Sequence, residues 1–167
     1  MNGNLLFDFT INKENNTIHI MREFNAELEL VWQGWTTAEL LDQWWGPQPW
    51  RAETKTLDFR EGGYWLYAMV SPEGEKHWAK TNYISIEKEK SFRQKDGFCD
   101  ENGTMNLSFP QNLVENSFSQ KENKVLVDMI LTFDTLADLE MTIEMGFKEG
   151  MTIDFQQLDE LLSSLKK

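Results

Sequence analysis

The clearest alternation of apolar and polar positions lies in residues 124–133, KVLVDMILTF. Every second residue from Val125 to Phe133 is apolar, whereas Asp128 and Thr132 fall between them. Successive side chains of a strand point to opposite faces, so this period of two gathers the apolar side chains on one face. The pattern therefore predicts an antiparallel strand with one buried face.

Shorter stretches of β-branched and aromatic residues predict further strands, separated by turns that contain glycine, proline or asparagine. The predicted strands are residues 17–24, 51–59, 64–70, 76–86, 90–98 and 111–120. Gly62 and Gly63 suit a tight hairpin turn between the second and third of these. In the third strand, Trp65, Tyr67 and Met69 share one face. A run of antiparallel strands is therefore expected from residue 50 to residue 133.

Between the first two predicted strands the period becomes helical. Asn25 can cap a short helix at this point. The apolar residues of this helix recur at helical spacing, at Leu28, Val31, Trp32 and Trp35. Thr36 and Glu39 predict a second short helix, because a hydroxyl and a carboxylate three residues apart form a capping box. Two short helices are therefore expected after the first strand.

Residues 43–50, QWWGPQPW, end the second helix and concentrate aromatic rings at its exit. Gly46 suits a left-handed residue after the helix, and the two prolines that follow prevent the helix from continuing. Trp44 and Trp45 have two interpretations. They form an aromatic lip that grips a ligand or partner, or they anchor the second helix to the edge of the sheet. We favour the anchoring role and keep the lip as the alternative.

From Asp134 the helical period runs to the end of the chain, and Thr135 with Asp138 forms a second capping box. The apolar stripe of this long helix consists of Met141, Met145, Met151, Phe155, Leu158, Leu162 and Leu165. Gly146 and Gly150 inside it each cost about 1 kcal/mol relative to alanine, so we expect a bend or a close approach to the sheet there. Eight acidic residues oppose one lysine between residues 134 and 160, which predicts a strongly negative outer face.

This order of elements predicts an α+β fold, in which the long C-terminal helix lies across one face of a curved antiparallel sheet. A gap remains wherever the side chains of helix and sheet do not meet. The residues expected to line it and to contact a ligand are Trp65, Tyr67, Met69, Phe98, Met129, Leu131, Met151 and Phe155. The alternative is a filled core without a cavity. The hydroxyl of Tyr67 would need a hydrogen-bond partner if it is buried.

Size and charge narrow the class of protein. A chain of 167 residues fits one domain, which we place at residues 1–167. Its net charge of −12 repels phosphate backbones and anionic membranes, so nucleic acid is not an expected partner. No apolar run is long enough to span a membrane, and the N-terminus lacks the features of a secretion signal. With a single cysteine, Cys99, these features favour a cytoplasmic protein.

Candidate catalytic and metal-binding groups are sparse. His19 and His77 are the histidines of the chain, they lie on separate predicted strands, and neither has a second ligand at metal-binding spacing. Cys99 has no adjacent cation that would activate its thiol. We therefore predict no metal site, no cofactor and no catalytic residue.

Four segments, in order, resemble one known superfamily. Residues 25–47, NAELELVWQGWTTAELLDQWWGP, are similar to the opening of the SRPBCC or START-like superfamily, in particular of its branch named after the activator of Hsp90 ATPase. Residues 58–75, 96–103 and 146–162 continue the resemblance. It implies a helix-grip fold, often with an apolar cavity, and no shared catalytic residues. The family often has tryptophan where Met151 stands, which implies more room there.

Three functions follow as hypotheses. The first is non-enzymatic binding of a small hydrophobic or amphipathic ligand between the C-terminal helix and the sheet. The second, implied by the resemblance and by the acidic helix face, is interaction with a chaperone of the Hsp90 type, in a stress response. The third is an enzyme of the cyclase or dehydratase type that occurs in the superfamily, which would need His77, Tyr67 or a carboxylate in the cavity with a shifted pKa.

Overall fold

The computed structural model describes residues 5–165, so residues 1–4 and 166–167 of the predicted domain lie outside the described residues. Eight antiparallel strands form one sheet in the order β1-β2-β8-β7-β6-β5-β4-β3. The strands are β1 (Phe7–Asn12), β2 (Thr17–Phe24), β3 (Arg51–Leu57), β4 (Tyr64–Val70), β5 (Lys76–Glu87), β6 (Ser91–Phe98), β7 (Asn112–Lys121) and β8 (Lys124–Phe133). The helices are α1 (Leu28–Thr36), α2 (Ala38–Trp44), α3 (Leu136–Glu144) and α4 (Phe147–Leu165).

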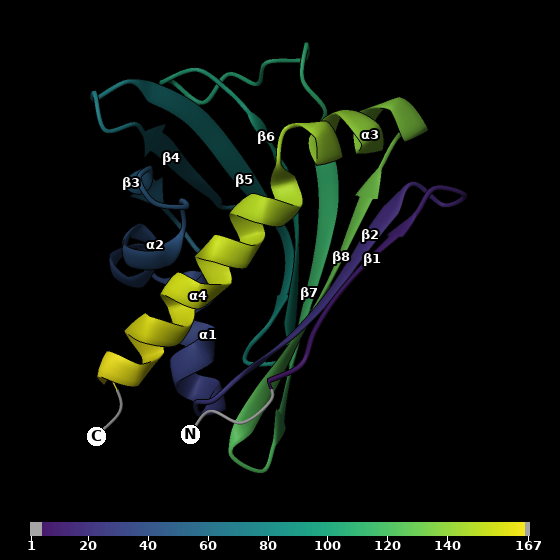
Figure 1. Ribbon diagram of the computed structural model, residues 1–167. Helices are drawn as coiled ribbons and strands as arrows, with labels where there is room; N and C mark the ends of the chain where they lie inside the picture. Colours follow the sequence, from purple (N-terminus) through teal and green to yellow (C-terminus); the bar gives the residue numbers. More distant parts are fainter. Residues whose placement is uncertain (1–4, 166–167) are drawn as a thin grey trace.

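The sheet is curved, and α4 crosses its concave face (Figure 1). The helices α1 and α2 lie beside α4 on the same side of the sheet, and α3 lies near the end of α4 at which its chain begins. This arrangement is the predicted α+β helix-grip fold. Among the described residues, no helix has both the length and the apolar character that crossing a membrane requires.

The strand β1 was not predicted. It pairs along its whole length with β2, with Phe9 opposite Ile20, so the two short helices follow the second strand rather than the first. Phe7 packs edge-on against Phe155, with ring centroids 5.7 Å apart, and Phe9 packs against Phe147 at 6.1 Å. The additional strand therefore packs against α4 through Phe7 and Phe9.

The predicted caps of the first two helices are wrong. Glu27 rather than Asn25 is the N-cap of α1, and its side chain forms no capping hydrogen bond. Thr36 is the last residue of α1 and donates through its hydroxyl to the carbonyl of Trp32, at 2.8 Å. Thr37 takes the N-cap position of α2 instead, without a side-chain cap. Thr36 is buried, so packing decides which of the two neighbouring threonines begins the helix.

The predicted long C-terminal helix is two helices, because Gly146 has a φ of +87° and interrupts it. One of the two hydrogen bonds of the predicted capping box is present: the hydroxyl of Thr135 accepts from the backbone N–H of Asp138 at 3.1 Å. The middle of the predicted stripe is buried, at Met151, Phe155, Leu158 and Leu162. Its outer members, Met141, Met145 and Leu165, are exposed.

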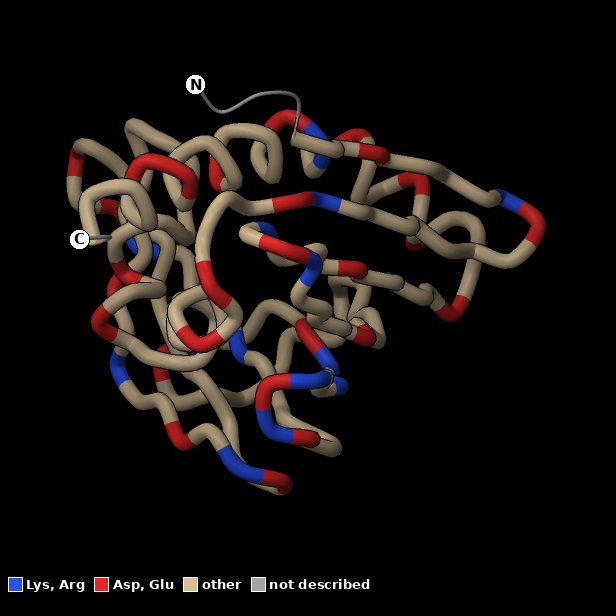
Figure 2. Tube along the Cα trace, turned by 90° about the horizontal axis from the view of Figure 1, so that it is seen from below, with Lys and Arg blue, Asp and Glu red and all other residues tan. Residues whose placement is uncertain are grey.

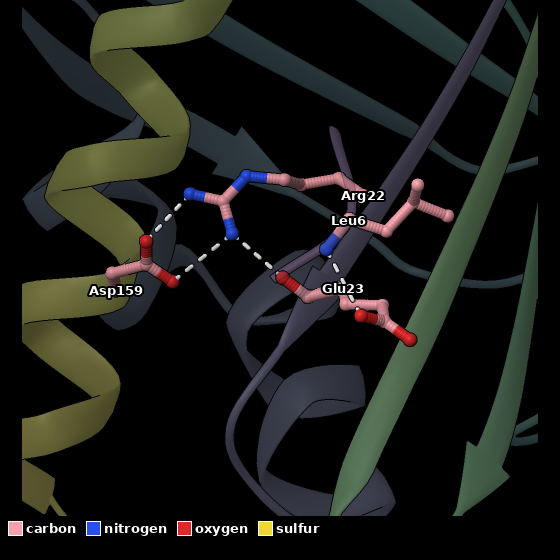
Figure 3. Close-up of polar contacts among 4 residues, drawn as sticks. All are labelled: Leu6, Arg22, Glu23 and Asp159. Carbon is pink, nitrogen blue, oxygen red and sulfur yellow. Dashed lines mark hydrogen bonds and ion pairs between the residues drawn. The ribbon is translucent and has the colours of Figure 1, made fainter. Parts of the chain in front are cut away.

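Asp and Glu are spread along the chain, and Lys and Arg are fewer (Figure 2). The outer face of α4 is less acidic than predicted, because Asp154 is buried and Asp159 pairs with Arg22 of β2. Arg22 Nη2 lies 2.5 Å from Asp159 Oδ2, and Arg22 Nη1 lies 3.3 Å from Asp159 Oδ1. This two-point ion pair ties the C-terminal helix to the sheet (Figure 3).

Candidate functional site

A cavity of about 340 Å³ lies between the concave face of the sheet and the start of α4. Its walls come from β4 to β8, from the loop after α2, from the loop that connects β6 to β7, and from the junction of α3 and α4. Met145 at this junction lines the cavity and is 53% exposed. The cavity therefore reaches the surface beside α3.

Most of the residues predicted to line a gap do line this cavity. They are Trp65, Tyr67, Met69, Phe98, Met129, Leu131 and Met151. Phe155 is not in the lining: it packs edge-on against Phe7 and Phe24, with ring centroids 5.7 Å from each. The unpredicted strand β1 provides the first of these contacts. Contact of the lining residues with a ligand stays a prediction.

The two neighbouring tryptophans of the QWWGPQPW segment have different surroundings. Trp44 is fully buried, and its indole N–H donates to the carbonyl of Gly34 at 2.8 Å. Trp45 lines the cavity, and its indole N–H donates to the hydroxyl oxygen of Tyr67 at 3.1 Å. The expected partner of the buried Tyr67 hydroxyl is therefore Trp45. Trp44 anchors α2 to α1 and not, as predicted, to the edge of the sheet, whereas Trp45 forms part of the cavity wall.

Side chains of α4 hold this segment in place. Asp154 Oδ1 accepts from the backbone N–H of Gly46 at 3.2 Å. Gln157 Nε2 donates to the carbonyls of Trp44 and Gly46, at 2.9 and 3.0 Å, and its Oε1 accepts from the N–H of Gln48 at 3.0 Å. One turn of α4 thus fixes the backbone that carries Trp45 and the following Pro47 into the cavity wall.

A row of polar side chains crosses the strand wall of the cavity from β7 to β5. Asn116 Nδ2 donates to Gln94 Oε1 at 3.3 Å, and Gln94 Nε2 donates to Asp96 Oδ1 at 2.8 Å. Thr81 donates to the same oxygen of Asp96 at 2.7 Å. Asn116 is 1% exposed, and its Oδ1 has no hydrogen-bond partner among the described residues. This row supplies acceptors to an otherwise largely apolar cavity.

Two carboxyl groups of the cavity have raised pKa values. Burial raises the pKa of Asp154 to about 8, against the lowering effect of the Gly46 N–H. Burial also raises the pKa of Asp96 to about 6, although the hydrogen bonds from Thr81 and Gln94 lower it. The side chain of Asp96 is half-buried, and it lines the cavity. Burial likewise raises the pKa of the Tyr67 hydroxyl, and the negative charge of Asp96 adds to the shift.

Sequence reasoning missed the polar residues of the cavity, although a signal for some of them was present. In the predicted strand at residues 90–98, Phe92, Gln94 and Asp96 alternate with the exposed Arg93 and Lys95. Once Phe98 is assigned to the inner face, the period of two places Asp96 there as well. A local signal also existed for Asp154, because it lies three residues after Met151 and four before Leu158, a spacing that places it on the buried face of the helix.

Of the groups considered for catalysis or metal binding, Tyr67 lines the cavity, whereas the two histidines and Cys99 do not. His19 Nε2 lies 3.0 Å from Asp128 Oδ1, and His77 Nε2 lies 3.6 Å from Glu75 Oε2. Neither histidine is among the described residues that line the cavity. Burial raises the pKa of the Cys99 thiol. Within residues 5–165, no group of three or more His, Cys, Asp or Glu side chains is arranged to hold a metal ion.

Comparison with known proteins adds a family and several similar structures. A family model described as activator of Hsp90 ATPase homolog 1-like protein matches residues 25–163. A crystal structure of a protein from Mycobacterium smegmatis is 26% identical, with a TM-score of 0.87, over 98% of this chain and 100% of that chain. A solution structure from Arthrobacter aurescens is 30% identical, with a TM-score of 0.88, over 94% and 91%. One from Staphylococcus epidermidis is 26% identical, with a TM-score of 0.82, over 95% and 96%. No curated protein matches this chain.

Proposed function

The chain belongs to the family of activator of Hsp90 ATPase homolog 1-like proteins, and we propose that it binds a small hydrophobic or amphipathic molecule between its sheet and α4. The observation that carries this proposal is the cavity of about 340 Å³. Small-molecule sites are typically clefts of roughly 300–1,000 Å³ with apolar walls and a few polar groups. The aromatic rings, methionines and short polar row of this cavity fit that description.

The cavity reaches the surface beside α3, so water fills it when no ligand is bound. An apolar occupant would displace this water from the largely apolar walls, and burying apolar surface stabilises by roughly 25 cal/mol per Å². Methionines suit such an occupant because they adapt to irregular apolar shapes, and Met69, Met129 and Met151 all line the cavity.

Displacement of a neutral fluorescent dye tests the proposal. Nile red is titrated into the purified protein, and gentle native mass spectrometry of the same material identifies any molecule that is carried through purification. Ala79→Leu extends a side chain from β5 into the cavity and should weaken dye binding, because Ala79 lines it. Ala137→Leu is the matched control, because Ala137 is exposed on α3. No dye binding and no carried molecule, or equal binding by both variants, would contradict the proposal.

Acid–base chemistry on the bound molecule is a second candidate, favoured by the carboxyl groups of Asp96 and Asp154. Both line the cavity and have raised pKa values, which is the condition that enzymes use to hold acids and bases near neutral pH. The molecule recovered from the protein would be incubated with wild type and with Asp154→Asn. A change in its mass or isomer composition with wild type and not with the variant would support this candidate, and an unchanged molecule would oppose it.

Interaction with an Hsp90 chaperone stays a prediction, checked by the effect of this protein on the ATPase rate of an Hsp90.

A further inference from the structure

One buried acceptor beside the cavity has no donor within residues 5–165 to match it, although the hydroxyls of Tyr67 and Tyr83 line the same cavity. Asn116 Oδ1 has no partner among the described residues, although Asn116 is 1% exposed. Buried polar atoms nearly always have a partner, so each exception calls for an explanation. Asn116 lines the cavity, but its Oδ1 is closed to solvent, so the side chains around it would have to shift before a donor from the cavity reached it.

The hydrogen bonds around Asn116 fix the orientation of its amide. Its Nδ2 donates to the carbonyl of Phe92 at 3.4 Å and to Gln94 Oε1 at 3.3 Å. A flipped amide would bring its oxygen against both of these acceptors. Gln94 cannot flip in compensation, because its own Nε2 donates to Asp96 at 2.8 Å. Asn116 therefore donates to Gln94, Gln94 donates to Asp96, and the oxygen of Asn116 is left without a donor from the described part of the chain.

At the other end of the row, Asp96 lacks a cation. Its hydrogen-bond donors are the neutral groups of Thr81 and Gln94, and both reach Oδ1. None of the ion pairs among the described residues includes Asp96. The described residues that line the cavity include no Lys, Arg or His. A carboxylate removed from bulk water is normally paired, so a positive charge from outside the chain would complete this site.

We propose that the cavity takes an amphipathic cation, a protonated amine on an apolar body, whose ammonium pairs with the Asp96 carboxylate. The apolar body lies against Trp65, Met129 and Met151, which line the rest of the cavity. This inference rests on the proposed function and specifies the charge of the ligand. A fatty acid of the same length would meet the Asp96 carboxylate with a like charge and should be rejected.

Three octyl compounds with different head groups test the charge preference: octylamine, 1-octanol and octanoate, each used to displace Nile red at pH 7.5. At this pH the amine is protonated, and Asp96, with a pKa of about 6, is ionised. Charge-assisted hydrogen bonds are worth about tenfold or more in affinity relative to the neutral head group. We therefore expect octylamine to bind about tenfold more tightly than octanol and octanoate to bind most weakly.

Two variants assign the preference to one carboxylate. Asp96→Asn should bring the affinities for octylamine and octanol to within a factor of about two, because it retains the shape and the acceptor but not the charge. Asp128→Asn is the matched control, an aspartate of strand β8 that pairs with His19 away from the cavity, and it should retain the wild-type ratio. Unfolding temperatures of all three proteins identify any variant that fails to fold.

The outcomes separate this inference from the function on which it rests. If octanol or octanoate displaces the dye from wild type as well as octylamine does, the inference is overturned and hydrophobic binding stands. The inference is also overturned if folded Asp96→Asn keeps the preference for the amine. If neither the dye nor any octyl compound binds to wild type, the proposed function fails and the inference fails with it.

Discussion

Asp154→Asn is expected to remove most of a decline in stability that wild type shows as the pH rises. Asp154 is 4% exposed, and burial raises its pKa to about 8. An aspartate in an unfolded chain titrates near pH 4. Between about pH 4 and pH 8 the folded protein therefore holds a proton on Asp154 that the unfolded chain has lost. By linkage, the free energy of unfolding falls with rising pH wherever the folded state binds more protons.

The expected magnitude follows from the distance between these two pKa values. Each pH unit inside this window changes the free energy of unfolding by about 1.4 kcal/mol, so the contribution of Asp154 falls by about 3–4 kcal/mol between pH 5 and pH 8. This loss is a large part of a typical stability of about 5–15 kcal/mol. Asparagine keeps an oxygen that accepts from the Gly46 N–H, whose distance to Asp154 Oδ1 is 3.2 Å, and it cannot ionise.

Urea unfolding followed by tryptophan fluorescence at pH 5, 6, 7, 8 and 9, at constant ionic strength, measures this effect. The difference in unfolding free energy between Asp154→Asn and wild type should grow in favour of the variant as the pH rises, and level off above pH 8. Glu149→Gln removes one negative charge from an exposed position of the same helix, and its profile should run parallel to that of wild type. A difference between Asp154→Asn and wild type that stays constant from pH 5 to pH 8 would refute the reasoning.

Three further predictions concern the packing of α4 and the charge of the cavity. Gly150→Ala should raise the free energy of unfolding by up to about 1 kcal/mol, because a Cβ there meets only ordinary contacts. Gly146→Ala should lower it by roughly 1–2 kcal/mol, because φ is +87° at that residue. Both are checked by urea unfolding, and equal effects would contradict the assigned bend. Asp159→Ala should destabilise by about 3 kcal/mol, because it leaves the 9% exposed Arg22 side chain without a counter-ion, although Arg22 still donates to the carbonyl of Glu23. Arg22→Met should cost less, because water can reach the 28% exposed Asp159. Both are measured by urea unfolding, and the reverse order would disprove this account. Octylamine affinity should fall as the pH drops below about 6, where Asp96 becomes protonated, and a flat pH profile would exclude Asp96 as the charged partner.

Local patterns were sufficient for most of the fold. The strand at residues 124–133 was predicted with its bounds, because its alternation is complete and turns flank it. The first strand, Phe7–Asn12, was missed, since it lies at the edge of the sheet and most of its residues are exposed. The start of α2 was misplaced by one residue because Thr36 and Thr37 are both suitable caps in sequence. Burial of Thr36, a tertiary effect, decided between them.

For the site, the apolar period showed which face of α4 is buried, but not which part of that face lines the cavity. Met151 and Phe155 are one turn apart on the same buried stripe, yet Met151 lines the cavity and Phe155 packs against Phe7 and Phe24. The period of a helix cannot show where along its length the opposing sheet is filled. Asp154 was assigned to the outer face on its charge alone, because its acceptor role toward Gly46 depends on a contact 108 residues away in sequence.

The division of the interior into a filled part and a hollow part follows from the sizes of its residues. Beside α1, large rings fill the space: Trp32 packs edge-on against Phe92 and Phe118, with centroids 5.6 and 5.1 Å apart. In the cavity wall, two positions carry small residues: Gly150 on α4 and Ala79 on β5. Phe92 itself lines the cavity, so the packed rings beside α1 end where the cavity begins. The large rings on one side and the small residues on the other account for a core that is filled in one part and hollow in the next.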